Sequence, residues 1–211
     1  MLRIIIADDN EIVRRGVRHL IESHPGWEVC GEAADGETAL EIAVREEPDI
    51  AILDISLPVL SGIILTRLLR QDCPTTRVLL FTTHDDEETV NNGLAAGARG
   101  YLLKSDTGPQ LEAAIIALAA RKPYFSSPVA EILLDAAVND RKRSRLETFT
   151  LRELQVAQMI AEGASNKEVA SRLNIAVKTV ESHRASAMRK AGVRTAGQFV
   201  RFALRSNLIK A

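Results

Sequence analysis

Three aspartates in the first half of the chain come directly after short apolar runs. Asp8 and Asp9 follow residues 4–7, and Asp54 follows residues 50–53. Carboxylates that are crowded together raise one another's pKa unless a cation lies among them. Their hard oxygen atoms suit octahedral Mg²⁺. If the fold brings these three aspartates together, they predict a magnesium site.

Two more polar residues follow apolar runs in the same way. Thr82 follows residues 78–81, and Lys104 follows residues 100–103. A hydroxyl and an ammonium group beside carboxylates are suited to contact phosphoryl oxygens, and a carboxylate can act as the nucleophile in an in-line displacement. A lone aspartate after a strand is usually a turn residue. Five such polar residues at strand ends instead indicate one site, suited to a metal ion and to contacts with phosphoryl oxygens.

The apolar runs alternate with amphipathic stretches, and this alternation explains how residues far apart in the sequence would meet. Five strands are expected, separated by helical patterns such as residues 12–24, 36–46 and 109–121. Such β-α alternation predicts an α/β fold in which helices cover both faces of a doubly wound parallel sheet. In these sheets, ligand sites lie outside the carboxyl ends of the strands.

The acidic residues and their neighbours resemble the CheY-like receiver pattern, in a resemblance that covers about residues 1–120. It is carried by Asp8-Asp9, Asp54-Ile-Ser-Leu-Pro58 with Gly62, Thr82, and Gly100-Tyr-Leu-Leu-Lys104. The resemblance implies a (βα)5 flavodoxin-like fold and a histidine kinase partner. It also implies a role for each site residue: Asp54 accepts the phosphoryl group; Asp9, Asp54 and the Ser56 carbonyl hold Mg²⁺; Asp8 acts through water; Thr82 and Lys104 bind phosphoryl oxygens.

Two residues near this site have less definite roles. Tyr101 matches the aromatic residue that rotates when receivers switch, and an ordinary half-buried strand tyrosine is the alternative. His84, two residues after Thr82, is expected at the exposed rim of the site, where together with Ser56 it would tune the lifetime of the phosphate.

Two enzymatic alternatives are disfavoured. Haloacid-dehalogenase-type phosphatases form an aspartyl-phosphate with an Asp-x-Asp motif, but here Ser56 occupies the position of the second carboxylate. The chain contains no G-x-x-x-x-G-K-[ST] phosphate-binding loop. The sequence therefore predicts a protein that is phosphorylated but is not an enzyme.

A change of pattern after residue 121 predicts a domain boundary. Pro123 and Pro128 interrupt the α/β alternation, one more helix is expected over residues 129–138, and the charged residues 139–145 have the composition of a linker. The predicted organisation is a receiver at 1–121, a linker with a helix at 122–146 and a second, helical domain at 147–211.

The second domain contains a candidate helix-turn-helix. Residues 166–173 and 177–190 predict two helices. Asn174 lies in the turn between them, where asparagine tolerates left-handed geometry. Three apolar residues are spaced to pack where the helices cross: Ala170, Ile175 and Val180. An ordinary helical hairpin is the alternative, but basic residues on and beside the second helix favour DNA binding: Lys178, Arg184, Arg189 and Lys190.

A longer pattern resembles the LuxR-type DNA-binding domain, over about residues 147–211. It is carried by Thr150-Leu-Arg-Glu153, Gly163-Ala-Ser-Asn-Lys-Glu168, Lys178-Thr-Val-Glu-Ser-His183-Arg184 and Lys190-Ala-Gly-Val193. A receiver ahead of this domain is the arrangement of the NarL/FixJ response regulators. The resemblance implies that Glu181, Ser182 and Ala185 face base edges, and that Lys178, Thr179, His183 and Arg184 approach phosphates.

Two positions depart from the LuxR-type pattern. Ala176 replaces the serine that usually caps the second helix, and Ala191 replaces a common leucine. The first change removes a helix cap, which usually costs about 0.5 to 2 kcal/mol of stability. Neither change removes a residue expected to read bases.

Charge is distributed unequally along the chain. Residues 1–140 carry 12 Lys and Arg against 23 Asp and Glu, a net charge of −11, whereas residues 141–211 carry 15 against 5, a net charge of +10. A basic segment of this size suits nucleic acid. The predicted partners are a histidine kinase and double-stranded DNA. We expect the phosphorylated chain to form a homodimer and to bind the DNA in that form.

The sequence also predicts the location of the protein. No apolar run approaches the roughly 20 residues that span a bilayer, and the start of the chain lacks the pattern of a secretory signal. We expect a cytoplasmic protein with no membrane partner, in which Cys30 and Cys73 are small core residues. Two alternative functions remain: a DNA-binding regulator that does not need phosphorylation, and a phosphate sink in a relay.

Overall fold

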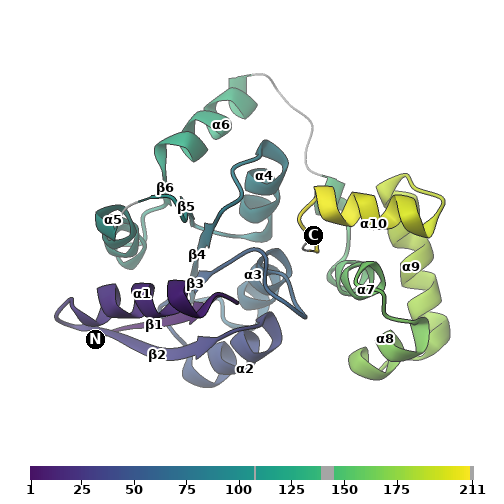
Figure 1. Cartoon of the computed structure of the whole chain (residues 1–211), viewed down its shortest axis with the longest axis horizontal. Helices are drawn as coiled ribbons and strands as arrows, with labels where there is room; N and C mark the ends of the chain where they lie inside the picture. Colours follow the sequence, from purple (N-terminus) through teal and green to yellow (C-terminus); the bar gives the residue numbers. More distant parts are fainter. Residues whose placement is uncertain (107, 139–144, 210–211) are drawn as a thin grey trace. The chain divides into compact units, whose positions relative to one another are not determined.

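The computed structural model describes residues 1–106, 108–138 and 145–209 of the chain. They belong to two compact units, Met1–Lys142 and Arg143–Ala211 (Figure 1). The predicted charged linker at 139–145 lies outside the described residues except for its last position, and the predicted domain limits remain a prediction. In the part of the chain that is described, no helix is long and apolar enough to span a membrane.

The first unit is built on a parallel sheet with the strand order β2-β1-β3-β4-β5-β6. The strands are β1 (Leu2–Ala7), β2 (Trp27–Ala33), β3 (Ile50–Leu53), β4 (Arg77–Thr82), β5 (Gly100–Leu103) and β6 (Tyr124–Phe125). The order reverses between β1 and β3, as a doubly wound sheet requires. The carboxyl ends of β1 and β3 therefore lie side by side.

The five strands predicted over the first 120 residues are present, and a sixth strand lies beyond them. The segment between the two prolines contributes β6, in which Tyr124 pairs with Gly100 and Phe125 with Tyr101 of β5. A strand of two residues is too short to show an alternating apolar pattern, so the sequence held no local signal for it. Its position depends on the neighbouring strand.

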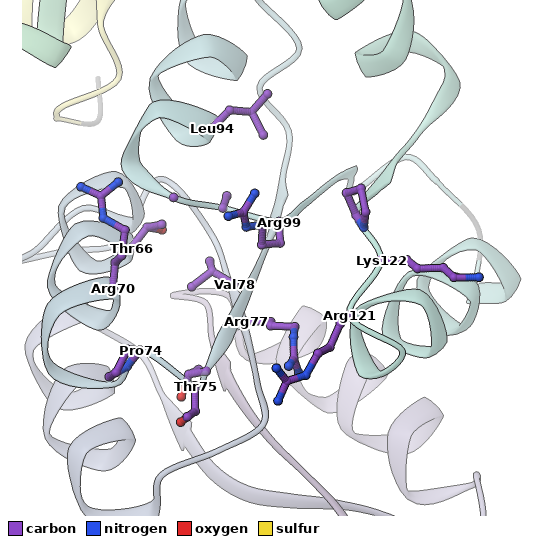
Figure 2. Close-up of a pocket in the computed structure, with 14 residues that line it drawn as sticks. Thr66, Arg70, Pro74, Thr75, Arg77, Val78, Leu94, Arg99, Arg121 and Lys122 are labelled. Atoms are coloured by element: carbon purple, nitrogen blue, oxygen red, sulfur yellow. The ribbon is translucent and has the colours of Figure 1, made fainter.

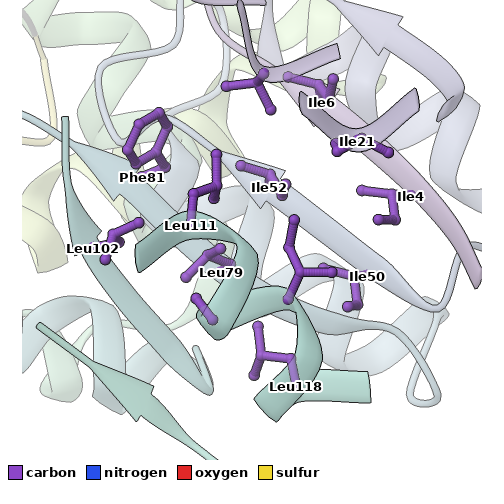
Figure 3. Close-up of a cluster of buried hydrophobic side chains, with 13 residues drawn as sticks. Ile4, Ile6, Ile21, Ile50, Ile52, Leu79, Phe81, Leu102, Leu111 and Leu118 are labelled. Atoms are coloured by element: carbon purple, nitrogen blue, oxygen red, sulfur yellow. The ribbon is translucent and has the colours of Figure 1, made fainter. Parts of the chain in front are cut away.

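In the described part of the first unit, six helices accompany this sheet. They are α1 (Glu11–Glu22), α2 (Gly36–Glu46), α3 (Gly62–Asp72), α4 (Glu87–Ala96), α5 (Gly108–Ala119) and α6 (Ser127–Val138). Helices α1 and α5 pack against each other and cover one face of the sheet, where Ile21 and Leu118 join strand residues such as Ile4, Ile52 and Leu79 in a continuous apolar core (Figure 3). Helix α3 packs beside both α2 and α4.

In its described residues, the second unit contains helices and no strand. A short 3₁₀ helix, η1 (Arg145–Thr148), precedes α7 (Leu151–Ala161), α8 (Asn166–Leu173), α9 (Val177–Ala191) and α10 (Ala196–Arg205). The predicted helices of the helix-turn-helix are α8 and α9. Ala170 and Val180 are buried in the core between them with Ile175 packed alongside, and Asn174 has the predicted left-handed backbone, with φ of 51°.

The N-termini of these helices differ in one respect. Helices α7, α8 and α10 each begin with a capping box, formed by Thr150, Ser165 and Thr195 with the residue three positions later. Helix α9 begins after Ala176, which supplies no side-chain cap. The sequence indicated that this helix lacks a side-chain cap, and the fold confirms it.

Candidate functional site

The three aspartates singled out in the sequence lie together at one edge of the sheet. Asp8 and Asp9 follow β1, Asp54 follows β3, and the last residues of these strands, Ala7 and Leu53, pair with each other. One carboxylate oxygen from each aspartate lies within 4.8 Å of the others. Asp8 and Asp54 are buried, whereas Asp9 is exposed. The cluster is thus open to solvent on one side.

Lys104, after β5, reaches the two buried carboxylates. Its Nζ lies 2.6 Å from Oδ2 of Asp8 and 2.9 Å from Oδ2 of Asp54. Burial raises the pKa of Asp8, although the hydrogen bond from Lys104 opposes this effect. Burial also works against a charged Lys104, but its bonds to the two carboxylates outweigh that penalty and raise the pKa of the ammonium group. One ammonium therefore faces two buried carboxylates.

The donor set fits a hard divalent cation. Oδ1 of Asp54 is buried and has no hydrogen-bond partner among the described residues, and a buried polar atom of this kind usually has one. Mg²⁺ prefers carboxylate oxygens as ligands. Here three carboxylates are clustered, one of their oxygens has no hydrogen-bond partner among the described residues, and one carboxylate is exposed. A cation at this position would offset the negative charge that Lys104 leaves unbalanced.

Local backbone packing explains the spacing of the Asp-x-x-x-Pro-x-x-x-Gly motif. The amide of Gly62 donates a hydrogen bond to the carbonyl of Ile55, and a side chain at Gly62 would place its Cβ 2.1 Å from the carbonyl oxygen of Asp54. Only glycine permits this approach. The segment after β3 therefore folds back tightly and fixes Asp54, whose amide donates to the carbonyl of Ala7.

The backbone of His84 joins two residues that the sequence assigned to the site. The amide of His84 lies 3.5 Å from Oγ1 of Thr82, and its carbonyl accepts a 2.7 Å hydrogen bond from the Tyr101 hydroxyl. Thr82 and Tyr101 are both fully buried, and burial raises the pKa of Tyr101. Tyr101 is therefore not the half-buried tyrosine of the alternative interpretation, because β6 and α4 lie against β5; its role as a switch remains a prediction.

The side chain of His84 is connected to the acceptor loop as well. Its Nε2 lies 2.8 Å from Oγ of Ser56, and both residues are half-buried. His84 was expected to be exposed at the rim of the site, but it is half-buried against a specific partner, Ser56. The sequence singled out both residues without indicating this contact, because 28 positions separate them. The role predicted for the Ser56 carbonyl remains a prediction.

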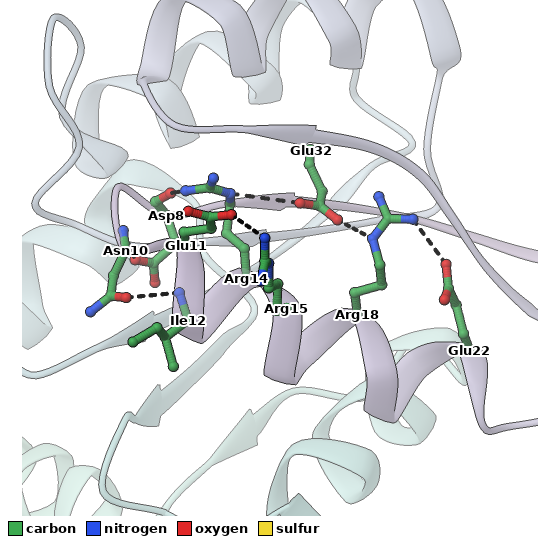
Figure 4. Close-up of polar contacts among 9 residues, drawn as sticks. All are labelled: Asp8, Asn10, Glu11, Ile12, Arg14, Arg15, Arg18, Glu22 and Glu32. Carbon is green, nitrogen blue, oxygen red and sulfur yellow. Dashed lines mark hydrogen bonds and ion pairs between the residues drawn. The ribbon is translucent and has the colours of Figure 1, made fainter.

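A residue outside the sequence motifs, Arg14, holds the end of β1. Arg14, on α1, donates from Nη1 to the carbonyl oxygen of Asp8 at 2.7 Å, and its Nε lies 3.6 Å from Glu32 on β2 (Figure 4). The Asp8 carboxylate itself accepts from the Asn10 amide at 2.9 Å. Arg14 therefore positions the backbone between the two aspartates, and no sequence motif marked it.

In the second unit, four of the residues expected to contact DNA lie on one side of α9. They follow helical spacing and are exposed: Lys178, Glu181, Ser182 and Ala185. Thr179 is exposed beside them, and His183 and Arg184 are half-buried. The opposite side of the helix is buried through Val180, Ala187 and Ala191. The hydrophobic core thus fixes which side of α9 is presented to solvent.

One of these residues also has a structural contact. Nη1 of Arg184 donates to Oδ1 of Asn166, at the start of α8, at 3.2 Å. This bond ties the two helices of the helix-turn-helix together. Ala191, the second departure from the LuxR-type pattern, is buried against the core and leaves the exposed side unchanged.

Two family models match the chain. The response regulator receiver domain matches residues 4–116, and the bacterial regulatory proteins of the luxR family match residues 147–203. The first contains all of the acidic site, and the second contains α7, α8, α9 and most of α10.

Similar proteins resemble the chain over nearly its whole length. The oxygen regulatory protein NreC of Staphylococcus carnosus is 33% identical over 215 residues, which cover 99% of this chain and 99% of that protein. RcsB from Salmonella enterica serovar Typhimurium, solved bound to the promoter rprA in the presence of the phosphomimetic BeF3⁻, is 25% identical with a TM-score of 0.65, over 95% of this chain and 97% of that one. A structure of two RcsB dimers bound to two parallel DNAs is 28% identical with a TM-score of 0.60, over 97% and 98%.

Proposed function

Because the chain belongs to the response regulators that join a receiver to a LuxR-type DNA-binding domain, it is a phosphorylation-controlled transcription regulator, and we propose that Asp54 is its phosphoryl acceptor and histidine kinase its donor. The unpartnered, buried Oδ1 of Asp54 carries this proposal. Asp8 is held by Lys104 and by the Asn10 amide, and Asp9 is exposed. Asp54 alone combines burial with an oxygen that no described group occupies.

The proposed reaction modifies the protein itself. A carboxylate oxygen of Asp54 forms a bond to phosphorus while the bond from phosphorus to the imidazole nitrogen of the kinase breaks. Lys104 already lies against Asp54 and would hold a phosphoryl oxygen, with the Thr82 hydroxyl as a second donor. Each chain accepts one phosphoryl group, so the reaction is stoichiometric rather than enzymatic.

We propose that Asp8, Asp9, Asp54 and the Ser56 carbonyl hold Mg²⁺. Bound there, the ion would offset negative charge on the carboxylates and on the incoming phosphoryl group. Arg14 positions the backbone of Asp8, and Gly62 positions that of Asp54. The chain thus contributes geometry at two strands, and Lys104 contributes a fixed positive charge.

We propose that Thr82 and Tyr101 report the phosphorylation state. Their shared contact is the backbone of His84, so a shift of Thr82 toward a phosphoryl group would move the group that accepts the Tyr101 hydrogen bond. Tyr101 would then change position next to α4. The hydrogen bond between Ser56 and His84 would tune how long the phosphate survives.

The acceptor assignment is tested with the full chain, a small phosphodonor such as acetyl phosphate, and Mg²⁺. Wild type should gain one acid-labile phosphate, and Asp54→Asn should gain none. Asp72→Asn, a change at the exposed last residue of α3, should be labelled like wild type. If Asp54→Asn is labelled at the wild-type rate and stoichiometry, the assignment is overturned.

We further propose that the exposed side of α9 enters the major groove of double-stranded DNA as part of a homodimer. Glu181, Ser182 and Ala185 would face base edges, while Lys178, Thr179, His183 and Arg184 would approach phosphates. The helical spacing of the exposed residues supports this arrangement. The DNA-bound RcsB dimers support a dimeric complex for this chain. These partners would place the function in the cytoplasm.

Two substitutions on this surface separate affinity from sequence preference. Lys178→Ala should weaken binding to all duplexes similarly and reduce the salt slope by about one, because it removes a phosphate contact. Glu181→Ala should relax preference at one base pair by about 1 to 3 kcal/mol. Equal effects of both changes on every duplex would contradict this division of roles.

Control by phosphorylation is measured on the same duplexes. The phosphorylated full chain should bind its preferred duplex more tightly than the unmodified chain at the same salt concentration. A chain that binds equally well in both states would instead be a phosphorylation-independent regulator. A chain that accepts phosphate and shows no duplex preference would be a phosphate sink.

A further inference from the structure

A second polar cavity lies in the first unit, away from the acidic cluster. Its volume is about 540 Å³, and its lining comes from α3, from the start of β4, from the turn before β5 and from the segment after α5. Arg77 is the first residue of β4, and Arg99 immediately precedes β5. The cavity therefore lies at the amino ends of strands whose carboxyl ends carry Thr82 and Lys104. It is at the opposite edge of the sheet from Asp54.

The cavity is unusual in its charge. Five cationic residues line it, and no aspartate or glutamate does: Arg70, Arg77, Arg99, Arg121 and Lys122. Residues 1–140 contain only 12 Lys and Arg against 23 Asp and Glu, so nearly half of the cations of an acidic unit face one cavity. Among the described residues, none of the five forms an ion pair.

The side chains lie on several sides of the cavity (Figure 2). Arg77 and Arg121 extend toward the same part of it from different elements, and Thr75 adds an exposed hydroxyl nearby. Arg70 lies across from them on α3, where its Nη1 donates to the carbonyl of Ala95 at 3.3 Å. Guanidinium groups arranged in this way offer donors to several separate anionic groups at once.

Arg121 has an unfavourable backbone conformation. Its φ is 62°, in the left-handed region, and the amide of the next residue, Lys122, donates back to the carbonyl of Ala117 at 2.8 Å, which closes the end of α5. Glycine is the usual residue at this position of a helix end, because it has no Cβ. Here an arginine is held in that conformation, and its side chain lines the cavity.

From these observations we propose that the cavity binds a small anion carrying two or more phosphate groups. Guanidinium groups match phosphate oxygens in pairs of parallel hydrogen bonds, and the volume lies within the range of small-molecule sites. One phosphate would engage only part of the set, because the cations come from four segments. A chain of phosphates, inorganic or attached to a nucleoside, would relieve the repulsion among all of them.

Polyanion binding at the cavity does not depend on phosphorylation of Asp54. Asp54 lies at the other edge of the sheet, among carboxylates that repel a free polyanion. An Asp54→Asn chain should therefore bind the polyanion like wild type. Failure of one assignment would leave the other standing.

The test uses isothermal titration calorimetry on the full chain, without Mg²⁺ and at fixed ionic strength. The probes are inorganic tripolyphosphate, ATP and AMP, with a short DNA duplex as a separate arm. The basic second unit also attracts anions, so the amide resonances of Gly97, Ala98 and Arg99 are followed by NMR to locate binding at the cavity.

Two substitutions in the cavity are compared with one outside it. Arg121→Gly suits the left-handed backbone and should leave the melting temperature unchanged or higher, while it removes one cation. Arg77→Gln removes another. Arg15→Gln changes an exposed arginine on α1 that pairs with Glu11, and it serves as the matched control.

We expect tripolyphosphate and ATP to shift the three amide resonances and to bind more tightly than AMP. Each cavity variant should weaken that binding about tenfold, the usual effect of losing a charged hydrogen bond, and the control should not. Tighter binding of ATP would identify a nucleotide, and tighter binding of tripolyphosphate an inorganic chain. The proposal is overturned if the resonances do not move, if AMP binds as well as ATP, or if the cavity variants weaken only binding to the duplex.

Discussion

Each of the two units holds a half-buried lysine against carboxylates, with different balances of charge. In the first unit, Lys104 faces both Asp8 and Asp54. In the second, the one carboxylate that pairs with Lys190 among the described residues is Glu153, with Oε2 2.5 Å from Nζ. A one-to-one pair can satisfy its own charge, whereas two carboxylates against one ammonium leave an excess. Lys190 and Glu153 thus form a balanced ion pair, whereas Asp8 and Asp54 keep negative charge that a cation could offset.

The surroundings of the two sites agree with this difference. Glu153 accepts hydrogen bonds from the Thr150 amide, from Ser186 and from Lys190. These contacts outweigh the effect of burial and lower its pKa to about 2. In the first unit burial dominates at Asp8 and raises its pKa, and Oδ1 of Asp54 has no partner among the described residues. Satisfied polar groups therefore mark the structural pair, and an unsatisfied one marks the proposed acceptor.

The largest expected effect is the response of the second unit to acid. A carboxyl whose pKa falls from 4.5 to about 2 on folding stabilises the fold above its unfolded value, and this contribution disappears as pH falls from about 4.5 to about 2. The loss should be about 3 kcal/mol in the free energy of unfolding of this unit. Hydrogen exchange of α7 and α9 amides in the full chain measures it.

The control for the acid response is Glu153→Gln, which has no carboxyl to titrate at this position. Its stability should fall less than that of wild type over the same pH range. If the stability of the two proteins changed identically with pH, Glu153 would not be a stabilising ion-pair partner. The second unit would then not contain the balanced ion pair that distinguishes it from the first.

The substitution itself should be costly at neutral pH. Glu153→Gln leaves Lys190 without its counter-charge and should lower the free energy of unfolding of the second unit by about 2 kcal/mol. The added change Lys190→Met should recover part of this loss, because no unpaired charge remains. Fluorescence of Trp27, the single tryptophan, reports the first unit and should be unaffected.

Mg²⁺ should stabilise the first unit and leave the stability of the second unit unchanged. A ligand at ten times its dissociation constant stabilises the state that binds it by about 1.4 kcal/mol. We expect this increase in the first unit, followed by denaturant unfolding with Trp27 fluorescence at matched ionic strength. Asp9→Asn should reduce the increase, and the second unit should not respond. An equal gain in both units would argue against a specific cation site.

The smallest effect concerns the uncapped helix. Ala176→Ser should stabilise the second unit by about 1 kcal/mol, because a serine oxygen at this position can accept from a free amide of the first turn. Helices α7, α8 and α10 already have such caps. The measurement is the melting temperature of the second unit. A serine that changes nothing would show that α9 is held by its core contacts alone.

Much of the fold could be predicted from local patterns. Strands β3 and β5 and helix α8 begin and end at the predicted residues, because an apolar run bounded by polar residues, or a short amphipathic stretch ending in Asn174, specifies each of them. The candidate acidic site was predictable for a related reason. In a parallel sheet, polar residues that follow strands must meet at one edge, and Asp8, Asp54 and Lys104 do so.

Other features depend on contacts between residues that are distant in sequence. Strand β6 exists because β5 offers it a free edge, and its two residues have no pattern of their own. Arg14 reaches Asp8 from the first turn of α1, and His84 links Thr82, Tyr101 and Ser56 through its backbone and side chain. Residue types alone did not indicate either role.

The division has a physical cause. Apolar periodicity and the polar residues that end strands are properties of short segments, so the order of elements, the acidic edge and the buried side of α9 follow from local sequence. The partner of a charged side chain depends on which segments pack together. The sharing of Lys104 by two carboxylates, the pairing of Lys190 with Glu153 and the lining of one cavity by five cations from four segments therefore arise only on folding.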